Sequence, residues 1–314
     1  MRTFLVTGGA GFIGSHLVEG LLGRGDRVRV LDNFLTGKRE NLASFARDIE
    51  LVEGDLRDIE ACRRAVRGAE VVFHEAALPS VPRSVADPAL SNDINVGGML
   101  NLLLAARDAG VRRVVFASSS SVYGDDPELP KREGKEGLLL SPYAVTKHVG
   151  EKYAQTFHVL YGLETISLRY FNVFGPRQDP ASQYAAAVPQ FITRILRGEA
   201  PTIYGDGEQS RDFTFVANVV EGNFLAADKP GLGHDVMNLA CGEGITVNRL
   251  AAEINSILGA SVRPVHVAER PGDIRHSLAD ISRAKAALGF EPGAGFREGL
   301  ETTIRWYRER SATP

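Results

Sequence analysis

The sequence predicts an α/β fold built on a doubly wound parallel sheet. Short apolar runs typical of strands alternate with longer helical stretches through the first half of the chain. Such alternation is the pattern of a parallel sheet covered by helices on both faces. A glycine-rich turn also joins the first run directly to a helix. We expect strands at residues 4–7, 28–32, 49–53, 71–73, 113–117 and 165–169.

The second half of the chain changes in character. Pro, Gly and aromatic residues punctuate it, as in a smaller region built largely from loops. Two segments, the one after Phe213 and the run 236–239, are expected to return to the sheet. The sequence therefore predicts a domain of residues 1–174, joined by segments near 211–240, and a smaller, interleaved C-terminal domain of residues 175–314.

Two long helical stretches have clear starting signals. Asp87-Pro88 begins the first and Ser141-Pro142 the second, each with an N-cap residue before a helix-start proline. The polar stretch 125–137 is expected to be a loop beside the hydroxyl-rich segment 119–124.

The glycine-rich turn has the features of a dinucleotide-binding site. Gly8, Gly11 and Gly14 have the spacing G-x-x-G-x-x-G, and a helix follows at once. A pyrophosphate can therefore reach the positive end of that helix. Asp32 ends the second strand run, where a carboxylate accepts hydrogen bonds from an adenosine ribose and repels a 2′-phosphate. This arrangement indicates a Rossmann-type sheet and favours NAD over NADP.

Charged residues near this turn refine the expectation. Lys38 and Arg39 follow the strand-end acid closely and weaken the exclusion of NADP. Asp55 follows the third strand run and suits the adenine amino group. The run 71–77 ends in small residues against which a cofactor could lie. Its His74 is expected to be structural, as a single His beside an apolar strand usually is.

A hydroxyl, a phenol and an ammonium group stand near the middle of the chain. Tyr143 and Lys147 are four residues apart, so they share a helix face, and the ammonium is expected to lower the pKa of the phenol. A free phenol titrates near pH 10 and is a poor base at neutral pH. Beside Lys147 and the positive ring of an oxidised nicotinamide, the phenolate becomes accessible.

The motifs resemble those of a known family over nearly the whole chain. The chain is similar to the extended short-chain dehydrogenase/reductase superfamily and, within it, to the UDP-hexose 4-epimerases, most of all the bacterial UDP-N-acetylglucosamine 4-epimerases. The segments that carry the resemblance are residues 7–14, 119–124, 143–147, 168–177, 205–207, 210–213 and 270–273.

The resemblance implies reversible inversion at C4 of a UDP-hexose through a 4-keto intermediate, with tightly bound NAD and no metal. Catalysis falls to Ser119, Tyr143 and Lys147, with Ser120 and Ser121 as alternatives to the first. The implied NAD-binding residues are Gly8, Gly11, Phe12, Ile13, Gly14, Asp32, Asn33, Asp55, Leu56, Ala76, Ala77, Asn95, Tyr143, Lys147 and Tyr170. The implied substrate-binding residues are Ser80, Ser119, Ser120, Asn172, Gln178, Val188, Tyr204, Arg211, Arg270, Asp273 and Ser277.

The identity of the hexose depends on a single small side chain. In family members restricted to glucose and galactose, a tyrosine commonly occupies the position of Ser277, against the C2 substituent. Serine leaves room for an acetamido group, which favours UDP-GlcNAc/UDP-GalNAc, with UDP-Glc/UDP-Gal as a second pair. UDP-glucuronate is an alternative, since Arg83 or Arg275 could pair with its carboxylate.

Other functions on the same scaffold are less favoured. The 4,6-dehydratases carry Asp-Glu where this chain has Ser120-Ser121, and those serines cannot serve as the acids of elimination. A UDP-sugar dehydrogenase would use the same three groups and stays open. A nucleotide-sensing binding protein is disfavoured, because such proteins commonly lack the Tyr-Lys pair.

Composition sets further limits. The chain has 314 residues, 44% of them hydrophobic, and a net charge of -3, which gives no broad electrostatic case for nucleic acid. Cys62 and Cys241 are too few for a disulfide framework or a zinc site. No signal peptide or membrane-spanning run is evident, so we expect no membrane association and a cytoplasmic protein. The resemblance also implies a homodimer formed by the two long helices.

Overall fold

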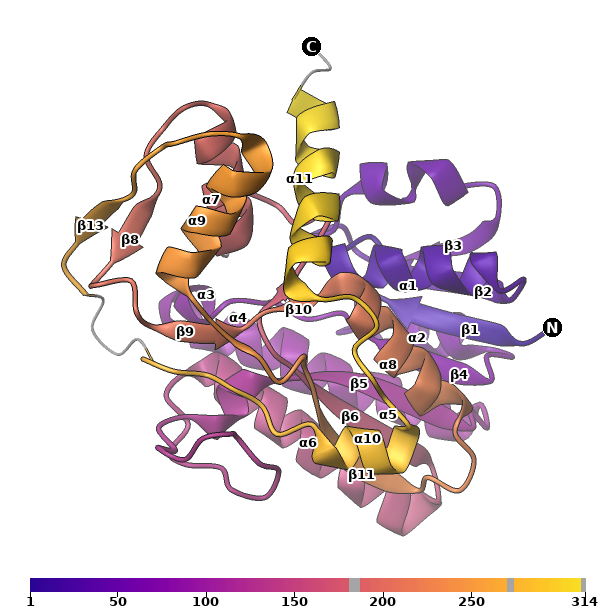
Figure 1. Ribbon diagram of the computed structural model, residues 1–314. Helices are drawn as coiled ribbons and strands as arrows, with labels where there is room; N and C mark the ends of the chain where they lie inside the picture. The colour runs from indigo at the N-terminus through magenta and orange to yellow at the C-terminus, as the bar shows by residue number, and fades with distance from the viewer. Residues whose placement is uncertain (181–186, 270–273, 312–314) are drawn as a thin grey trace.

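The computed structural model describes residues 1–180, 187–269 and 274–311. Its centre is a seven-stranded parallel sheet (Figure 1) in the order β11-β6-β5-β4-β1-β2-β3. The strands are β1 (Thr3–Thr7), β2 (Arg27–Asp32), β3 (Ile49–Glu53), β4 (Val71–His74), β5 (Arg113–Ser119), β6 (Glu164–Tyr170) and β11 (His234–Leu239). The central strands are buried on both faces, which explains why they are continuous apolar runs rather than alternating ones. All six strands expected in the first half of the chain are confirmed.

Helices cover both faces of this sheet, so the predicted doubly wound fold is confirmed. One face is covered by α1 (Phe12–Gly23), α8 (Val216–Asp228) and α10 (Ser282–Leu288). The other is covered by α2 (Ile59–Val66), α5 (Gly98–Asp108) and α6 (Pro142–Tyr161). The carboxyl ends of the strands remain open between the two layers, where ligands bind in such folds.

The two long helical stretches begin where the sequence indicates. The side chain of Asp87 accepts a hydrogen bond from the backbone N–H of Leu90 at 2.9 Å, and Ser141 caps α6 through Ala144 at 3.1 Å. The first stretch runs through α4 (Pro88–Asn92) and a π-helical turn into α5. The short α3 (Val81–Ala86) and α4 both pack against α6.

The smaller part of the molecule differs from the expectation. It is built from helices rather than largely from loops, because three amphipathic helices enclose a phenylalanine-rich core of their own. The helices are α7 (Ala187–Leu196), α9 (Val247–Leu258) and α11 (Phe296–Ser311). Short strand pairs join them: β7 (Val173–Phe174) with β10 (Thr214–Phe215), β9 (Ser210–Asp212) with β12 (Gly244–Thr246), and β8 (Thr202–Tyr204) with β13 (Val265–Val267).

The chain passes back to the main sheet after Phe213, though not wholly as expected. The run 236–239 lies in β11, which pairs with β6. The segment directly after Phe213 instead forms β10 and then α8, which covers the sheet without joining it. The domain boundary between residues 174 and 175 stays a prediction.

The polar stretch 125–137 is an irregular loop. It packs on the β6–β11 edge, where the Glu133 carboxylate accepts from the backbone N–H of Asn238 at 2.6 Å and Glu136 pairs with Arg169 at 2.5 Å. It lies beside the segment 119–124, as expected, since the backbone N–H of Gly137 donates to the carbonyl oxygen of Tyr123 at 3.1 Å, but it lines neither of the cavities described below.

Candidate active site

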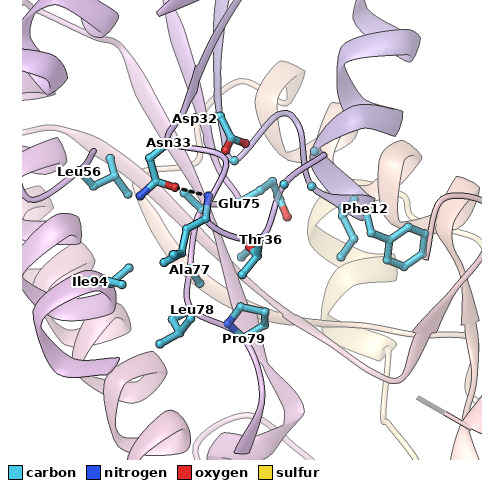
Figure 2. A pocket seen from close by; sticks show the side chains of 18 of the residues that line it. Phe12, Asp32, Asn33, Thr36, Leu56, Glu75, Ala77, Leu78, Pro79 and Ile94 are labelled. Atoms are coloured by element: carbon cyan, nitrogen blue, oxygen red, sulfur yellow. Dashed lines mark hydrogen bonds between the residues drawn. The ribbon is translucent and has the colours of Figure 1, made fainter. Parts of the chain in front are cut away.

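A cavity of about 600 Å³ opens at the carboxyl ends of the central strands. Figure 2 shows side chains from several strand ends around it, among them Asp32 at the end of β2, Leu56 after β3 and Glu75 after β4. It brings together nearly all of the predicted NAD-binding residues. Those that line it are Gly8, Gly11, Phe12, Ile13, Gly14, Asp32, Asn33, Asp55, Leu56, Ala76, Ala77, Tyr143, Lys147 and Tyr170.

The glycine turn leaves the start of α1 open to an anion. Gly8 has φ +69°, and a Cβ there would lie 2.7 Å from the backbone of Ala76. A Cβ on Gly14 would lie 2.2 Å from the carbonyl oxygen of Gly8. These two glycines are therefore required by the packing of the turn itself. Gly11 is the N-cap of α1, without a side-chain cap, and the first turn carries no acid. Such a helix start suits a pyrophosphate.

The Asp32 carboxylate is held in place by the backbone. It accepts hydrogen bonds from the N–H groups of Ala10 at 2.9 Å and Phe34 at 2.7 Å. The two cations expected to weaken the exclusion of NADP have other partners. Lys38 pairs with Asp179 at 3.3 Å. Arg39 pairs with a carboxylate of β3 at 2.7 Å and stacks on an aromatic ring at 3.9 Å.

Asp55 lies on the wall of the same cavity. Its carboxylate accepts hydrogen bonds from Arg57 at 2.8 and 3.0 Å and from Asn33 at 2.7 Å. The bond to Arg57 is the largest cause that lowers the pKa of Asp55, to about 2. Asp55 is therefore an ionised acceptor, as its expected role toward an amino group requires.

Tyr143 lies at the start of α6, facing the cavity. Burial raises its pKa to about 12, and the nearby Ser119 side chain acts in the opposite direction. The expectation that Lys147 lowers this pKa is not met in the protein alone. The Lys147 Nζ donates to the carbonyl oxygen of Ala117 at 2.7 Å and lies 5.8 Å from the centre of the Tyr143 ring. Burial, which could not be read from a spacing of four residues, dominates.

Lys147 is itself buried, with 4% of its surface exposed. Burial lowers its pKa to about 8, whereas Glu75 and Glu151 act to raise it. Glu151 is buried behind the site, where it accepts from Ser118 at 2.5 Å and from Arg169 at 2.7 and 2.8 Å. This carboxylate ties α6 to the ends of β5 and β6.

His74 and Asn95 lie near the site without lining the cavity. His74 is buried and bonded to Thr7 at 2.8 Å, and burial lowers its pKa to about 3, in agreement with the structural role expected of it. Asn95 is the exception among the predicted NAD-binding residues. Its side chain bonds both backbone groups of Leu78, at 2.7 and 3.2 Å, and supports the wall without lining the cavity.

Glu75 was overlooked by the sequence analysis, which saw only a strand running into small residues. It lines the cavity and accepts a hydrogen bond from the Tyr170 hydroxyl at 2.8 Å. Burial raises its pKa to about 7. A charged residue directly after four buried strand residues was the available signal.

The predicted substrate-binding residues divide between two places. Ser80 and Gln178 line the first cavity. Asn172, Val188, Tyr204 and Arg211 line a second cavity of about 220 Å³ beside α7. Within it, Arg211 donates to the carbonyl oxygens of Ser210 and Arg275, at 2.9 and 3.2 Å.

Other predicted contacts lie elsewhere. Ser119 and Ser120 line neither cavity, although the Ser119 side chain acts to lower the pKa of Tyr143. Ser277 also lines neither cavity; its backbone N–H donates to the carbonyl oxygen of Ser210 at 3.0 Å. Arg270 and Asp273 lie outside the described residues.

The family model for NAD dependent epimerases and dehydratases matches residues 4–240. The chain belongs to this family. The predicted superfamily and its NAD cofactor are thereby confirmed, and the open glycine turn and the Asp32 wall fit that cofactor.

Relatives within the family carry different substrate names. The solved UDP-N-acetylglucosamine 4-epimerase of Methanobrevibacter ruminantium, in complex with UDP-N-acetylmuramic acid, is 43% identical, covers 98% of this chain and 99% of its own, and has a TM-score of 0.94. The UDP-glucose 4-epimerase of Mycolicibacterium smegmatis is 40% identical over 99% of this chain and 100% of its own. The UDP-glucuronate 4-epimerase of Thermodesulfobacterium geofontis is 34% identical over 98% and 97%. The prediction of an NAD-dependent UDP-sugar epimerase is confirmed at this level, without a choice of hexose.

Across 1–180, 187–269 and 274–311, no cluster of His, Cys, Asp and Glu side chains could hold a metal ion. Within the same residues, every helix is too short or too polar to cross a membrane.

Proposed function

We propose that this protein catalyses the reversible inversion of configuration at C4 of a UDP-hexose. The observation that carries the proposal is the meeting of two features in one cavity. Tyr143, whose pKa the Ser119 side chain acts to lower, and Lys147 line the same cavity as the glycine turn. A sugar carbon beside the tyrosine can therefore exchange hydride with a nicotinamide held by that turn.

Each side chain has a defined part in this reaction. Tyr143 takes the proton of the C4 hydroxyl as C4 becomes a ketone, and returns it after the sugar has turned. Ser119 holds the same oxygen, and Lys147 holds the cofactor ribose. When bound, NAD supplies a hydride acceptor and a positive charge beside the phenol. Because the hydride returns to C4, the reaction has no net oxidation.

The absence of two acids supports epimerisation over elimination. Ser120 and Ser121 occupy the positions where dehydratases have Asp-Glu, and neither hydroxyl can protonate a leaving group at neutral pH. A UDP-sugar dehydrogenase would release NADH, which an epimerase does not.

The proposed substrates are UDP-GlcNAc and UDP-GalNAc, with UDP-Glc and UDP-Gal as a second pair. The small Ser277 supports the acetamido sugars, and Arg211 in the second cavity is proposed to bind the diphosphate. A second candidate is UDP-glucuronate, which one observation favours. Arg83 lines the first cavity, whereas Arg275 is paired with Asp206 at 2.6 Å.

Incubation of the purified protein with each UDP-hexose, followed by separation of the products, tests the proposal. We expect each acetamido sugar to reach an equilibrium mixture of both C4 epimers without net NADH. Net NADH formation would identify a dehydrogenase, and loss of water from the sugar would identify a dehydratase. Conversion of UDP-glucuronate alone would select the second candidate.

The proposal also covers the oligomeric state of the protein and its domain boundary. We infer a homodimer in which α4, α5 and α6 contribute to the interface, and a UDP-sugar-binding domain of residues 175–314. Analytical ultracentrifugation tests the first: a single species of about 34 kDa, the mass of one chain, would contradict it.

A further inference from the structure

Glu75 lies at the centre of the carboxyl edge of the sheet. It directly follows β4, and its backbone N–H donates to the carbonyl oxygen of Thr7 in β1 at 3.2 Å. The next two strands, β5 and β6, end at Ser119 and Tyr170. Figure 2 shows Glu75 among the side chains that surround the first cavity.

The hydrogen-bond partners of this carboxylate are neutral. The Tyr170 hydroxyl donates to Glu75 Oε1 at 2.8 Å, and the Asn223 side chain in turn bonds that hydroxyl at 2.8 Å. Asn223 is anchored to the carbonyl oxygen of Val219 at 2.8 Å. Within the described part of the chain, Glu75 forms no ion pair, whereas Glu151, which also acts on Lys147, is paired with Arg169.

The ionisable groups that face Glu75 are Lys147 and Tyr143 on α6 and Tyr170 on β6. His74, next to it in the chain, is bonded to Thr7 and stacks on Phe116. The negative charge of Glu75 acts to raise the pKa of both Tyr143 and Lys147. Glu75, Tyr143 and Lys147 also line the same cavity, so this one carboxylate lies where it can act on both catalytic groups.

We propose that Glu75 is a positioning residue of the active site, whose carboxylate keeps Lys147 charged and opposes the ionisation of Tyr143. The proposal rests on the function proposed above, since it presumes that Tyr143 is the base. Two observations support the proposal. Glu75 has no ion-pair partner among the described residues, and it lines the same cavity as the glycine turn, Tyr143 and Lys147.

A titration of Tyr143 in the purified holoenzyme tests this directly. The tyrosinate absorbance of the protein is compared with that of its Tyr143→Phe counterpart across pH. Glu75→Gln keeps an acceptor for Tyr170 but removes the charge, so the Tyr143 midpoint should fall by about one pH unit.

Glu136→Gln is the matched control, because it removes a carboxylate of the same kind that is paired with Arg169 and lies outside the cavity. We expect no shift of the midpoint in this control. An unchanged midpoint in Glu75→Gln, or an equal shift in both variants, would overturn the proposal.

Thermal unfolding of the holoenzyme at several pH values distinguishes the effect of the Glu75 charge on stability from the effect of its packing. The pKa of Glu75 is raised from 4.5 to about 7 in the folded protein, so the folded state binds the extra proton in this range. Its contribution to stability is present below pH 4.5 and lost as pH rises through about 7. The Tm of Glu75→Gln minus the Tm of the wild type should therefore increase as the pH rises from 4.5 through about 7. An equal loss of Tm at every pH would show a packing role and refute the proposal.

Assays with UDP-hexoses keep this proposal separate from the proposed function. Normal interconversion by the wild type without a Tyr143 shift in Glu75→Gln would remove only the role of Glu75. A clear shift in a protein that interconverts no UDP-hexose would support the charge coupling and refute the proposed function.

Discussion

The two cavities are built in different ways. The wall of the first includes five glycines and three alanines, at turns and near strand ends, so the backbone forms part of its surface. The second is lined by larger side chains, among them Tyr204, Arg211 and Phe213, from short strands and from α7. Backbone at the end of a parallel sheet is fixed by strand register, whereas long side chains adapt to what they bind. We expect changes in the first cavity to affect turnover and cofactor binding, and changes in the second to affect the affinity for the UDP-sugar.

The largest effect is expected from Tyr143→Phe in the first cavity. Removing the hydroxyl eliminates the proposed proton acceptor, so kcat should fall about 10²- to 10⁴-fold. KM and bound NAD should change little, because the ring remains. Product formation and cofactor content measure both. Near-normal turnover with bound cofactor would contradict the assignment of the base.

Gly14→Ala tests the backbone of the same cavity. A Cβ would lie 2.2 Å from the carbonyl oxygen of Gly8, so the turn must shift and NAD should be lost on purification. Gly23→Ala, at a position where a Cβ meets nothing within 4 Å, is the matched control in the same helix. Full NAD occupancy in Gly14→Ala would show that the turn tolerates a side chain.

Arg211→Ala tests the second cavity. A charge-assisted hydrogen bond contributes about 1.5–3 kcal/mol, so loss of contact with a diphosphate should raise KM about 10- to 100-fold with little change in kcat. Arg249→Ala is the control, since that arginine pairs with Glu243 at 2.9 Å and does not line the cavity. A fall in kcat at unchanged KM would show that the second cavity contributes to turnover rather than to affinity, contrary to this expectation.

Ser277→Tyr tests whether a residue outside both cavities determines which hexose is accepted. An overfilled pocket costs about 1–3 kcal/mol, so turnover of the acetamido sugars should fall roughly tenfold or more, while UDP-Glc is spared. Parallel rates with UDP-GlcNAc and UDP-Glc measure the difference. Equal loss on both sugars would exclude Ser277 from the choice of hexose.

The smallest effect is expected from Asp179→Asn, which releases Lys38 beside the first cavity. The pair is exposed, and such pairs contribute about 0.2–1 kcal/mol, so binding of NADPH should improve no more than about fivefold. Glu53→Gln, which releases Arg39 in the same way, extends the test. Unchanged binding of NADPH in both variants would show that Asp32 alone excludes the 2′-phosphate.

The spacing of residues in the sequence predicted which residues line the first cavity, but it did not predict their pKa values. Gly8 and Asp32 lie at strand ends and Gly14 lies in the first turn of the helix that follows β1, so sequence order places them together at one edge of the parallel sheet. The pKa of Tyr143 could not be predicted, because it depends on how deeply α6 is buried. Asn95 shows the same limit, since its amide turns toward the backbone of Leu78 rather than into the cavity.

The smaller part of the molecule was harder to predict. Its strands are two or three residues long, and runs of that length have no recognisable period. Its helices were missed because Pro and Gly between them dominate the local composition. The segment after Phe213 was expected to join the sheet, but α8 covers it instead.

The position of β11 at the edge of the sheet has a consequence for synthesis of the chain. The Arg113 side chain in β5 is 0% exposed, and it donates to the carbonyl oxygens of Ala226 and Lys229, at 2.6 and 2.8 Å. Those acceptors, and the strand that covers β6, leave the ribosome long after the rest of the sheet. A nascent chain that ends before residue 226 therefore carries an open β6 edge and a guanidinium that has Glu164 but lacks these carbonyl acceptors. Open edges of this kind pair with other chains, so this stage of translation is where we expect a chaperone to engage.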